Sequence, residues 1–241
     1  MKVSNEDIEI SVVIPCLNED KTIGFCVTQA LNAIQMLHLK GEVIVADNGS
    51  EDGSIQIAVM SGAKVIRVIE RGYGNALKVG MSSAKGSLLI MADGDASYDF
   101  SSLRAFIEEF KRGSEVVIGN RFKGKIESGA MPWMNRRIGN PFLTVLCRLL
   151  FTVPVGDVCC GFRGLTREAF RKMDLKSGGM EFAAEMIIES EKLSLRIGEV
   201  PVDLKKDGRL RPSHLRIWRD GWLTLTLMIK ARIRRGFQKR G

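Results

Sequence analysis

The stretch Asp93-Gly94-Asp95 places two carboxylates one residue apart, a spacing that suits a site for a hard cation. It directly follows the apolar run at residues 88–91, which is typical of a short, fully buried strand. At the carboxyl edge of a parallel sheet such a pair can hold Mg²⁺ or Mn²⁺, because these ions accept carboxylates together with water and substrate phosphate oxygens. The alternative is an Asp-Gly turn that caps the next helix.

The elements that must position these carboxylates alternate between strand and helix. Apolar or β-branched runs predict strands at residues 10–14, 42–46, 64–69, 88–91, 115–119 and 195–202. Apolar periodicity predicts helices at residues 22–39, 54–61, 73–84, 101–111, 135–155, 166–173, 179–193 and 215–233, with a shaped loop at 157–164. This order predicts an α/β fold with a mostly parallel sheet, whose right-handed crossovers bring residues 15–19, 47–50 and 93–95 to one edge.

The charge of the chain is concentrated near its C-terminal end. Residues 205–241 contain twelve Lys and Arg against two Asp, a net charge of +10, whereas residues 1–204 have a net charge of −2. Such a basic segment indicates nucleic acid, an anionic membrane surface, or solubility alone. We therefore expect a near-neutral main domain at residues 1–204, which the family resemblance below makes the catalytic domain, followed at 205–241 by a basic loop and an amphipathic helix.

The five cysteines form no C-x-x-C pair, and the chain has only two histidines, which argues against a zinc site. An odd number of cysteines without a signal peptide favours reduced thiols in the cytoplasm. No apolar run approaches the ~18–20 residues that cross a bilayer, so we expect no transmembrane helix.

Nine segments in order resemble one family of enzymes. They are VVIPCLNE (12–19), ADNGSEDGS (46–54), RGYGNALKVG (71–80), MADGDASYDF (91–100), IGNRF (118–122), GAMPW with NRRIGNP (129–141), DVCCGFRG (157–164), GMEFAAEM (179–186) and DGRLRPSHLRIWRDGW (207–222). Over about residues 10–226 the chain resembles inverting glycosyltransferases of family 2 with the GT-A fold. The resemblance is closest to the branch that glycosylates polyprenyl (dolichyl-type) phosphates.

The resemblance implies a donor site for a nucleoside-diphosphate sugar, UDP-glucose or GDP-mannose. Asp93 and Asp95 would bind Mg²⁺ or Mn²⁺ together with the donor diphosphate. The position two beyond the second Asp is often Gln in the dolichyl-phosphate mannose branch, and here it is Ser97. The residues implied at the nucleotide are Pro15, Leu17, Glu19, Asp47, Gly74, Ala76, Asp93 and Asp95.

The resemblance also implies an acceptor site and a reaction centre. Arg121, with Arg136 or Arg137, resembles the arginines that bind the acceptor phosphate. Asp157 and Arg163 match a loop beside the reaction centre, and the residues implied in catalysis are Asp95, Arg121, Asp157 and Arg163. The basic loop at residues 205–211 resembles an element that closes over the donor, without a fixed register.

The expected reaction moves a hexose, glucose or mannose, to a polyprenyl phosphate such as dolichyl or undecaprenyl phosphate, with inversion. A phosphate monoester is already ionised near neutral pH and needs no strong base, which agrees with a chain of two histidines. A hydroxyl acceptor would need a base, for which Asp157 is the candidate. The alternatives are a family 2 enzyme with a soluble hydroxyl acceptor and a non-catalytic sugar-nucleotide-binding subunit.

The sequence of the predicted C-terminal helix indicates where in the cell the protein is located. Trp218 and Trp222 precede a cluster of Lys and Arg, and tryptophans prefer the headgroup region while basic residues attract anionic lipid. We expect a peripheral enzyme on the cytoplasmic face of a membrane; the alternative is a core-packing helix with a solvated basic end. Nucleic-acid binding is not expected, because few aromatics interleave with the basic residues.

Overall fold

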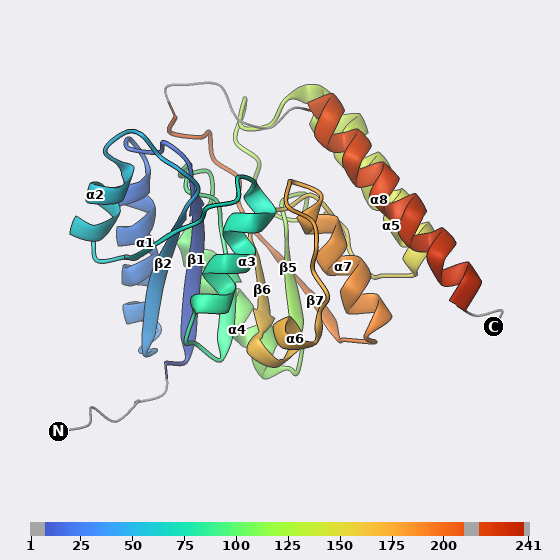
Figure 1. The fold of residues 1–241 in the computed structure, drawn as a ribbon, viewed down its shortest axis with the longest axis horizontal. Coiled ribbons are helices and arrows are strands. Elements are labelled where there is room, and N and C mark those ends of the chain that lie inside the picture. Colours follow the sequence, from blue (N-terminus) through green and yellow to red (C-terminus); the bar gives the residue numbers. More distant parts are fainter. Residues whose placement is uncertain (1–7, 210–216, 239–241) are drawn as a thin grey trace.

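The computed structural model describes residues 8–209 and 217–238. A seven-stranded sheet in the order β3-β2-β1-β4-β6-β5-β7 forms its centre (Figure 1). The strands are β1 (Ile10–Cys16), β2 (Gly41–Asp47), β3 (Lys64–Arg67), β4 (Leu88–Met91), β5 (Val116–Asn120), β6 (Arg163–Thr166) and β7 (Ile197–Pro201). The helices are α1 (Ile23–Met36), α2 (Ser54–Met60), α3 (Tyr73–Ser83), η1 (Phe100–Ser102), α4 (Leu103–Lys111), η2 (Asn135–Gly139), α5 (Asn140–Phe151), α6 (Arg167–Lys172), α7 (Phe182–Lys192) and α8 (Ile217–Gln238).

The central strands are buried on both faces, which explains their continuous apolar sequences. In β1, Val12 and Ile14 pack into a core cluster that includes residues of α1 and α4. Val13 points to the opposite face and packs into a second cluster that includes residues of α3, α5 and α7. The side-chain alternation of one strand therefore serves two separate apolar layers.

One strand departs from the prediction. Residues 157–164 were expected to form a loop, but β6 begins at Arg163 and runs antiparallel to both β4 and β5. Its sequence, RGLT, contains a charged residue and a glycine, so it lacks the apolar pattern of its neighbours. The other strand pairs are parallel, as predicted, and β7 lies at the edge that Pro201 favours.

The helix expected at residues 135–155 is divided in two. A π-helical turn, η2, precedes α5, and Pro141 lies at the start of α5. Proline has no N–H to donate to the carbonyl four residues earlier, so a regular α-helical ladder cannot continue through this point.

Helix α8 packs against α5 and α7, and Figure 1 shows α5 and α8 side by side. Met228 is fully buried in the second core cluster, with Leu227 and Ala231 packed against it. The C-terminal helix is therefore attached to the rest of the fold through one apolar face. In the described part of the chain, the helices are too short or too polar to cross a membrane.

Candidate active site

The carboxyl ends of β1, β2 and β4 meet at one edge of the sheet, as predicted. Parallel pairing places Cys16 opposite Asp47, and the Asn48 amide donates to the Cys16 carbonyl at 2.8 Å. The Asn18 amide donates to the Ser50 hydroxyl at 2.8 Å. The Ala92 amide donates to the Val13 carbonyl at 3.3 Å, which brings the residues after β4 to the same edge.

Asp47 shapes the turn at this edge. Its carboxylate is 2% exposed and accepts hydrogen bonds from the amides of Gly49, at 3.2 Å, and Ser50, at 3.3 Å. An Asx turn of this kind orients the backbone that follows it, so Asp47 fixes the turn at residues 47–50. This turn lies at the end of β2, next to the strand β1 that leads to the half-buried Pro15 and Leu17. These are the residues that the sequence placed at the nucleotide.

The start of α3 is occupied by protein rather than open to an anion. The amides of Gly74 and Asn75 donate to the Gly178 carbonyl at 2.9 and 3.3 Å, and the Gly72 amide donates to Asn48 Oδ1 at 2.6 Å. Gly72 has φ 138°, a conformation that favours glycine. The glycines thus allow the chain at Gly178 to approach the helix closely.

Ala76, the second residue predicted to line the nucleotide pocket, is 1% exposed. It packs with Ala46 and Val68 in a small apolar cluster. The side chain of Ala76 therefore packs below the end of β2, next to the residue that precedes Asp47.

Asp93 lies in a confined environment just after β4. The Tyr73 hydroxyl donates to its Oδ1 at 2.9 Å, and a Cβ placed on Gly161 would lie 2.5 Å from its Oδ2. Burial, and secondarily the negative charge of Asp95, raise the pKa of the Asp93 carboxyl to about 6. The hydrogen bond from Tyr73 and the positive charges of Arg209 and Arg121 oppose this rise.

Asp95 is paired with a cationic side chain from the loop after β7. Arg209 Nη2 lies 2.9 Å from Asp95 Oδ2, and Arg209 Nη1 lies 3.6 Å from Glu19 Oε1. The other carboxylate oxygen of Asp95 accepts from the Ser97 amide at 3.0 Å. Glu19 and Asp95, both implied at the nucleotide by the resemblance, are thus bridged by one guanidinium.

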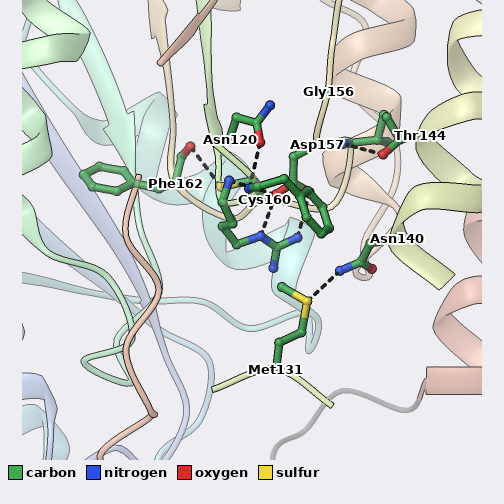
Figure 2. Close-up of polar contacts among 12 residues, drawn as sticks. Asn120, Met131, Asn140, Thr144, Gly156, Asp157, Cys160 and Phe162 are labelled. Carbon is green, nitrogen blue, oxygen red and sulfur yellow. Dashed lines mark hydrogen bonds and ion pairs between the residues drawn. The ribbon is translucent and has the colours of Figure 1, made fainter. Parts of the chain in front are cut away.

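Arg121 and Asp157 form a buried bidentate pair (Figure 2). Arg121 Nε donates to Asp157 Oδ2 at 2.7 Å, and Nη2 donates to Oδ1 at 2.8 Å. The Arg121 backbone amide also donates to Oδ2, at 3.2 Å. Asp157 is fully buried and the Arg121 side chain is 10% exposed. Burial lowers the pKa of the Arg121 guanidinium, but Tyr98 and the pairing with Asp157 outweigh it and raise this pKa well above its ordinary value.

Arg163 is placed differently from the other predicted catalytic residues. It is fully buried, and its guanidinium donates to three backbone carbonyls, those of Val158, Cys160 and Ala183. These bonds hold the 157–161 loop against the start of α7. Arg136 and Arg137 lie exposed on η2.

Three side chains at this edge were not assigned a role from the sequence: Tyr73, Tyr98 and Arg209. Tyr98 accepts a hydrogen bond of 2.9 Å from the Gly161 amide and so fixes the loop that faces Asp93. Both tyrosines lie inside segments that carried the resemblance, and a hydroxyl beside glycines or aspartates was the available signal. Arg209 belongs to the basic loop, but nothing in its neighbours distinguishes it from the other arginines there.

The donor atoms at this edge fit a divalent cation that also binds the substrate. Asp93 and Asp95 offer hard oxygen ligands. Asp95 already forms an ion pair with the guanidinium of Arg209, so a cation can reach this carboxylate. Among the residues that the structure describes, no third acidic, His or Cys side chain completes a metal cage. Two carboxylates suit Mg²⁺ or Mn²⁺, which take their remaining ligands from phosphate and water.

The family model for glycosyl transferase family 2 matches residues 11–174 of the chain. The chain belongs to glycosyltransferase family 2. The matched segment contains the strand ends, Asp93, Asp95, Arg121, Asp157 and Arg163. It ends before β7 and Arg209.

Two curated relatives extend beyond this segment. The low-salt glycan biosynthesis hexosyltransferase Agl6 of Haloferax volcanii is 35% identical over 221 residues, which cover 91% of this chain and 53% of that protein. The dolichyl-phosphate beta-glucosyltransferase of Drosophila melanogaster is 28% identical over 216 residues, 81% of this chain and 66% of that protein. The chain thus spans about half the length of Agl6.

Among solved structures, glucosyl-3-phosphoglycerate synthase from Mycobacterium tuberculosis, in complex with Mn²⁺, UDP-glucose and phosphoglyceric acid, superimposes with a TM-score of 0.73. The match covers 93% of this chain and 79% of that one, at 20% identity. The chain therefore has the predicted GT-A fold.

Proposed function

We propose that this glycosyltransferase moves a hexose, glucose or mannose, from a nucleoside-diphosphate sugar to a polyprenyl phosphate. The observation that carries the choice of acceptor is the pairing of Arg121 with Asp157. Asp157 is fully buried and both of its carboxylate oxygens accept hydrogen bonds from Arg121, at 2.7 and 2.8 Å, so the carboxylate is not placed to contact an alcohol acceptor as a base. A phosphate acceptor needs no such base.

The same pairing prepares Arg121 to hold an anion. A guanidinium has five N–H donors, and the Asp157 carboxylate uses one on Nε and one on Nη2. The remaining three lie on the edge turned away from Asp157, where they can bind phosphate oxygens as a fork. Arg136 and Arg137, exposed on η2, are proposed to complete the acceptor site.

In the proposed reaction an oxygen of the acceptor phosphate attacks the anomeric carbon of the sugar. The bond from that carbon to the donor diphosphate breaks, and the nucleoside diphosphate leaves with the electron pair, so one displacement inverts the configuration. Mg²⁺ or Mn²⁺ on Asp93 and Asp95 would neutralise the charge that grows on the leaving group. Asp47, Glu19 and the adjoining strand ends are proposed to position the nucleotide.

The proposal includes a place of action, the cytoplasmic face of a membrane. Exposed apolar side chains follow one another on η2 and α5 at the spacing of one helix face, namely Ile138, Phe142, Val145 and Leu149, which are 53–76% exposed. On the neighbouring helix α8, Trp222, Ile229 and Ile233 are 44–65% exposed, with Lys230, Arg232 and Arg234 exposed beside them. Apolar side chains flanked by cations fit the boundary of an anionic bilayer.

The reaction is tested by incubating the protein with UDP-glucose or GDP-mannose, each labelled in the sugar, together with undecaprenyl or dolichyl phosphate and Mg²⁺ or Mn²⁺. We expect label to enter the organic phase with one donor and to fall about 100-fold or more in Asp95→Asn. Glu108→Gln, an exposed carboxylate on α4, is the control and should keep activity. Donor turnover that labels only water-soluble products would favour a hydroxyl acceptor.

The place of action is tested by sedimentation with vesicles of phosphatidylglycerol and phosphatidylcholine. Leu149→Glu should reduce binding to the anionic vesicles several-fold, because it puts a charge into the apolar side of α5. Met60→Glu changes an apolar residue that is 86% exposed on α2, and it should have no such effect. Equal losses in both variants, or no binding by the unmodified protein, would contradict the membrane proposal.

A further inference from the structure

Arg209 occupies a position among three carboxylates. Its Nη2 lies 2.9 Å from Asp95 Oδ2 and 3.0 Å from Asp207 Oδ2, and its Nη1 lies 3.6 Å from Glu19 Oε1. The side chain is only 12% exposed. Its positive charge therefore sits on the carboxylate that the proposed reaction assigns to the metal.

The backbone holds Arg209 in this position independently of its charge. The Gly208 amide donates to the Asp95 carbonyl at 2.8 Å, and the Lys205 amide donates to the Ser97 carbonyl at 2.8 Å. Leu204 forms a β-bridge with Tyr98. Backbone contacts thus hold residues 204–208 against residues 95–98, and these contacts place the Arg209 side chain next to Asp95.

One donor of the guanidinium remains unsatisfied in this arrangement. Arg209 Nε is buried and has no hydrogen-bond partner among the residues that the structure describes. A buried donor without an acceptor lowers stability, so the contact with Asp95 is not the arrangement in which the hydrogen-bond donors of this side chain are best satisfied. An anion rich in acceptor oxygens, such as a diphosphate, would supply the missing partner.

We propose that Arg209 is an internal cation that competes with the divalent metal for Asp95, and that its side chain then changes its ion-pair partner from Asp95 to the donor diphosphate. This inference rests on the proposed function. A metal that binds the Asp95 carboxylate would lie close to a guanidinium bonded to that carboxylate, and the two positive charges would repel each other. Metal binding therefore requires Arg209 to leave Asp95, and the diphosphate that arrives with the metal offers it a new partner.

The inference predicts effects of opposite sign on two ligands. Removing the guanidinium frees Asp95, so the affinity for the metal alone rises. The same change removes a contact to the diphosphate, so the affinity for a nucleoside diphosphate in the presence of metal falls. A residue that only stabilised the loop would weaken both.

The test measures Mn²⁺ binding without nucleotide, from the electron paramagnetic resonance signal of free Mn²⁺, in the unmodified protein and in Arg209→Gln. We expect the Kd for Mn²⁺ to fall about 3- to 10-fold in Arg209→Gln, because the competing occupant is gone. Lys205→Gln removes an equal charge from the same segment, where Lys205 pairs with Asp99 at 2.7 Å, and should change the Kd less than twofold. Calorimetric titration of UDP and GDP at saturating Mn²⁺ should then show about 10-fold weaker binding of the preferred nucleotide to Arg209→Gln.

Equal Mn²⁺ affinity in Arg209→Gln and the unmodified protein would overturn the competition. An equal gain in Lys205→Gln would also overturn it, because the effect would then come from net charge alone. Unchanged nucleotide affinity would overturn the change of partner to the diphosphate. If neither protein binds Mn²⁺, both the metal dependence of the proposed function and this inference are contradicted. If both proteins bind Mn²⁺ equally well, only this inference is contradicted.

Discussion

The Tyr73 hydroxyl donates a 2.9 Å hydrogen bond to Asp93 Oδ1 and so joins the first turn of α3 to the end of β4. The bond stabilises the ionised carboxylate, but it does not offset burial and the neighbouring charge of Asp95, which together raise the pKa of Asp93 to about 6. Asp93 therefore gains or loses its proton near pH 6.

We expect Mn²⁺ binding to weaken as the pH falls through about 6, because a metal ligand must be deprotonated. Well below this pH the affinity should decline about tenfold per pH unit for the one proton displaced. Titrations with Mn²⁺ between pH 5 and pH 8 measure this, and an affinity that is constant over that range would contradict the raised pKa of Asp93.

In Tyr73→Phe the loss of Mn²⁺ affinity at low pH should begin at a higher pH. The variant loses the hydrogen bond that lowers the pKa of Asp93, while burial and the Asp95 charge remain, so the carboxyl takes up its proton more readily. The same titrations, with the midpoint compared between the two proteins, check the direction. A midpoint that moves to lower pH would show that the hydroxyl acts differently.

Asp93→Asn should stabilise the fold in metal-free buffer at pH 7.5. The folded-state pKa of Asp93, about 6, lies above its ordinary value of 3.8, so the native state binds more protons and its stability falls as the pH rises from 3.8 through 6. The uncharged amide avoids this loss. We expect a gain of about 1–3 kcal/mol in the free energy of unfolding at pH 7.5 that disappears near pH 4.

Urea denaturation at the two pH values measures this gain. The Asn variant keeps an oxygen that can accept from Tyr73, so the comparison isolates the charge. A gain of the same size at pH 4 and pH 7.5 would indicate that packing, and not ionisation, accounts for the difference.

Arg121 and Asp157 should depend on each other for stability. Either single change, Arg121→Met or Asp157→Leu, leaves one buried charge without its partner and should cost about 3–5 kcal/mol. The double variant leaves no charge and should cost clearly less than the two single changes together. Urea denaturation of all four proteins gives the coupling free energy, and additive losses would mean that the ion pair is not a unit.

Gly161→Ala should displace Asp93. The new methyl carbon would lie 2.5 Å from Asp93 Oδ2, closer than atoms can pack, so the loop or the carboxylate must move. We expect a loss of about 1–3 kcal/mol in stability and weaker Mn²⁺ binding. Gly221→Ala in α8 is the control, because its added carbon meets nothing within 4 Å and should stabilise the helix slightly.

The sequence indicated most of the sheet edge, because the signals there are local. An apolar run that stops at Asp93-Gly94-Asp95 predicts a strand end, and parallel connections place it at the same edge of the sheet as Asp47. The Arg121–Asp157 pair could not be found in this way. Its members are far apart in the sequence and meet through β5 and β6, and β6 itself carries no strand pattern.

Arg163 shows a second limit. An arginine in a polar loop is usually exposed, and its family role implied a place at the reaction centre. Arg163 can be buried because three backbone carbonyls accept hydrogen bonds from its guanidinium. The direction of these carbonyls is set by the folded loop, so it cannot be predicted from the neighbouring residue types.

The reversed strand β6 affects the order in which the site can form. Pairing of β1, β2 and β3 joins segments that are near in the sequence, whereas β6 joins Leu88 to Thr166 and closes a much longer loop, at a larger cost in chain entropy. That pairing helps to bring Gly161 to Asp93, together with the hydrogen bond from the Gly161 amide to Tyr98. Before the pairing forms, Asp93 lacks the loop that lies against its Oδ2 atom. The burial that raises its pKa is thus imposed when the chain brings its two halves together, and a nascent or truncated chain would have the strand ends without it.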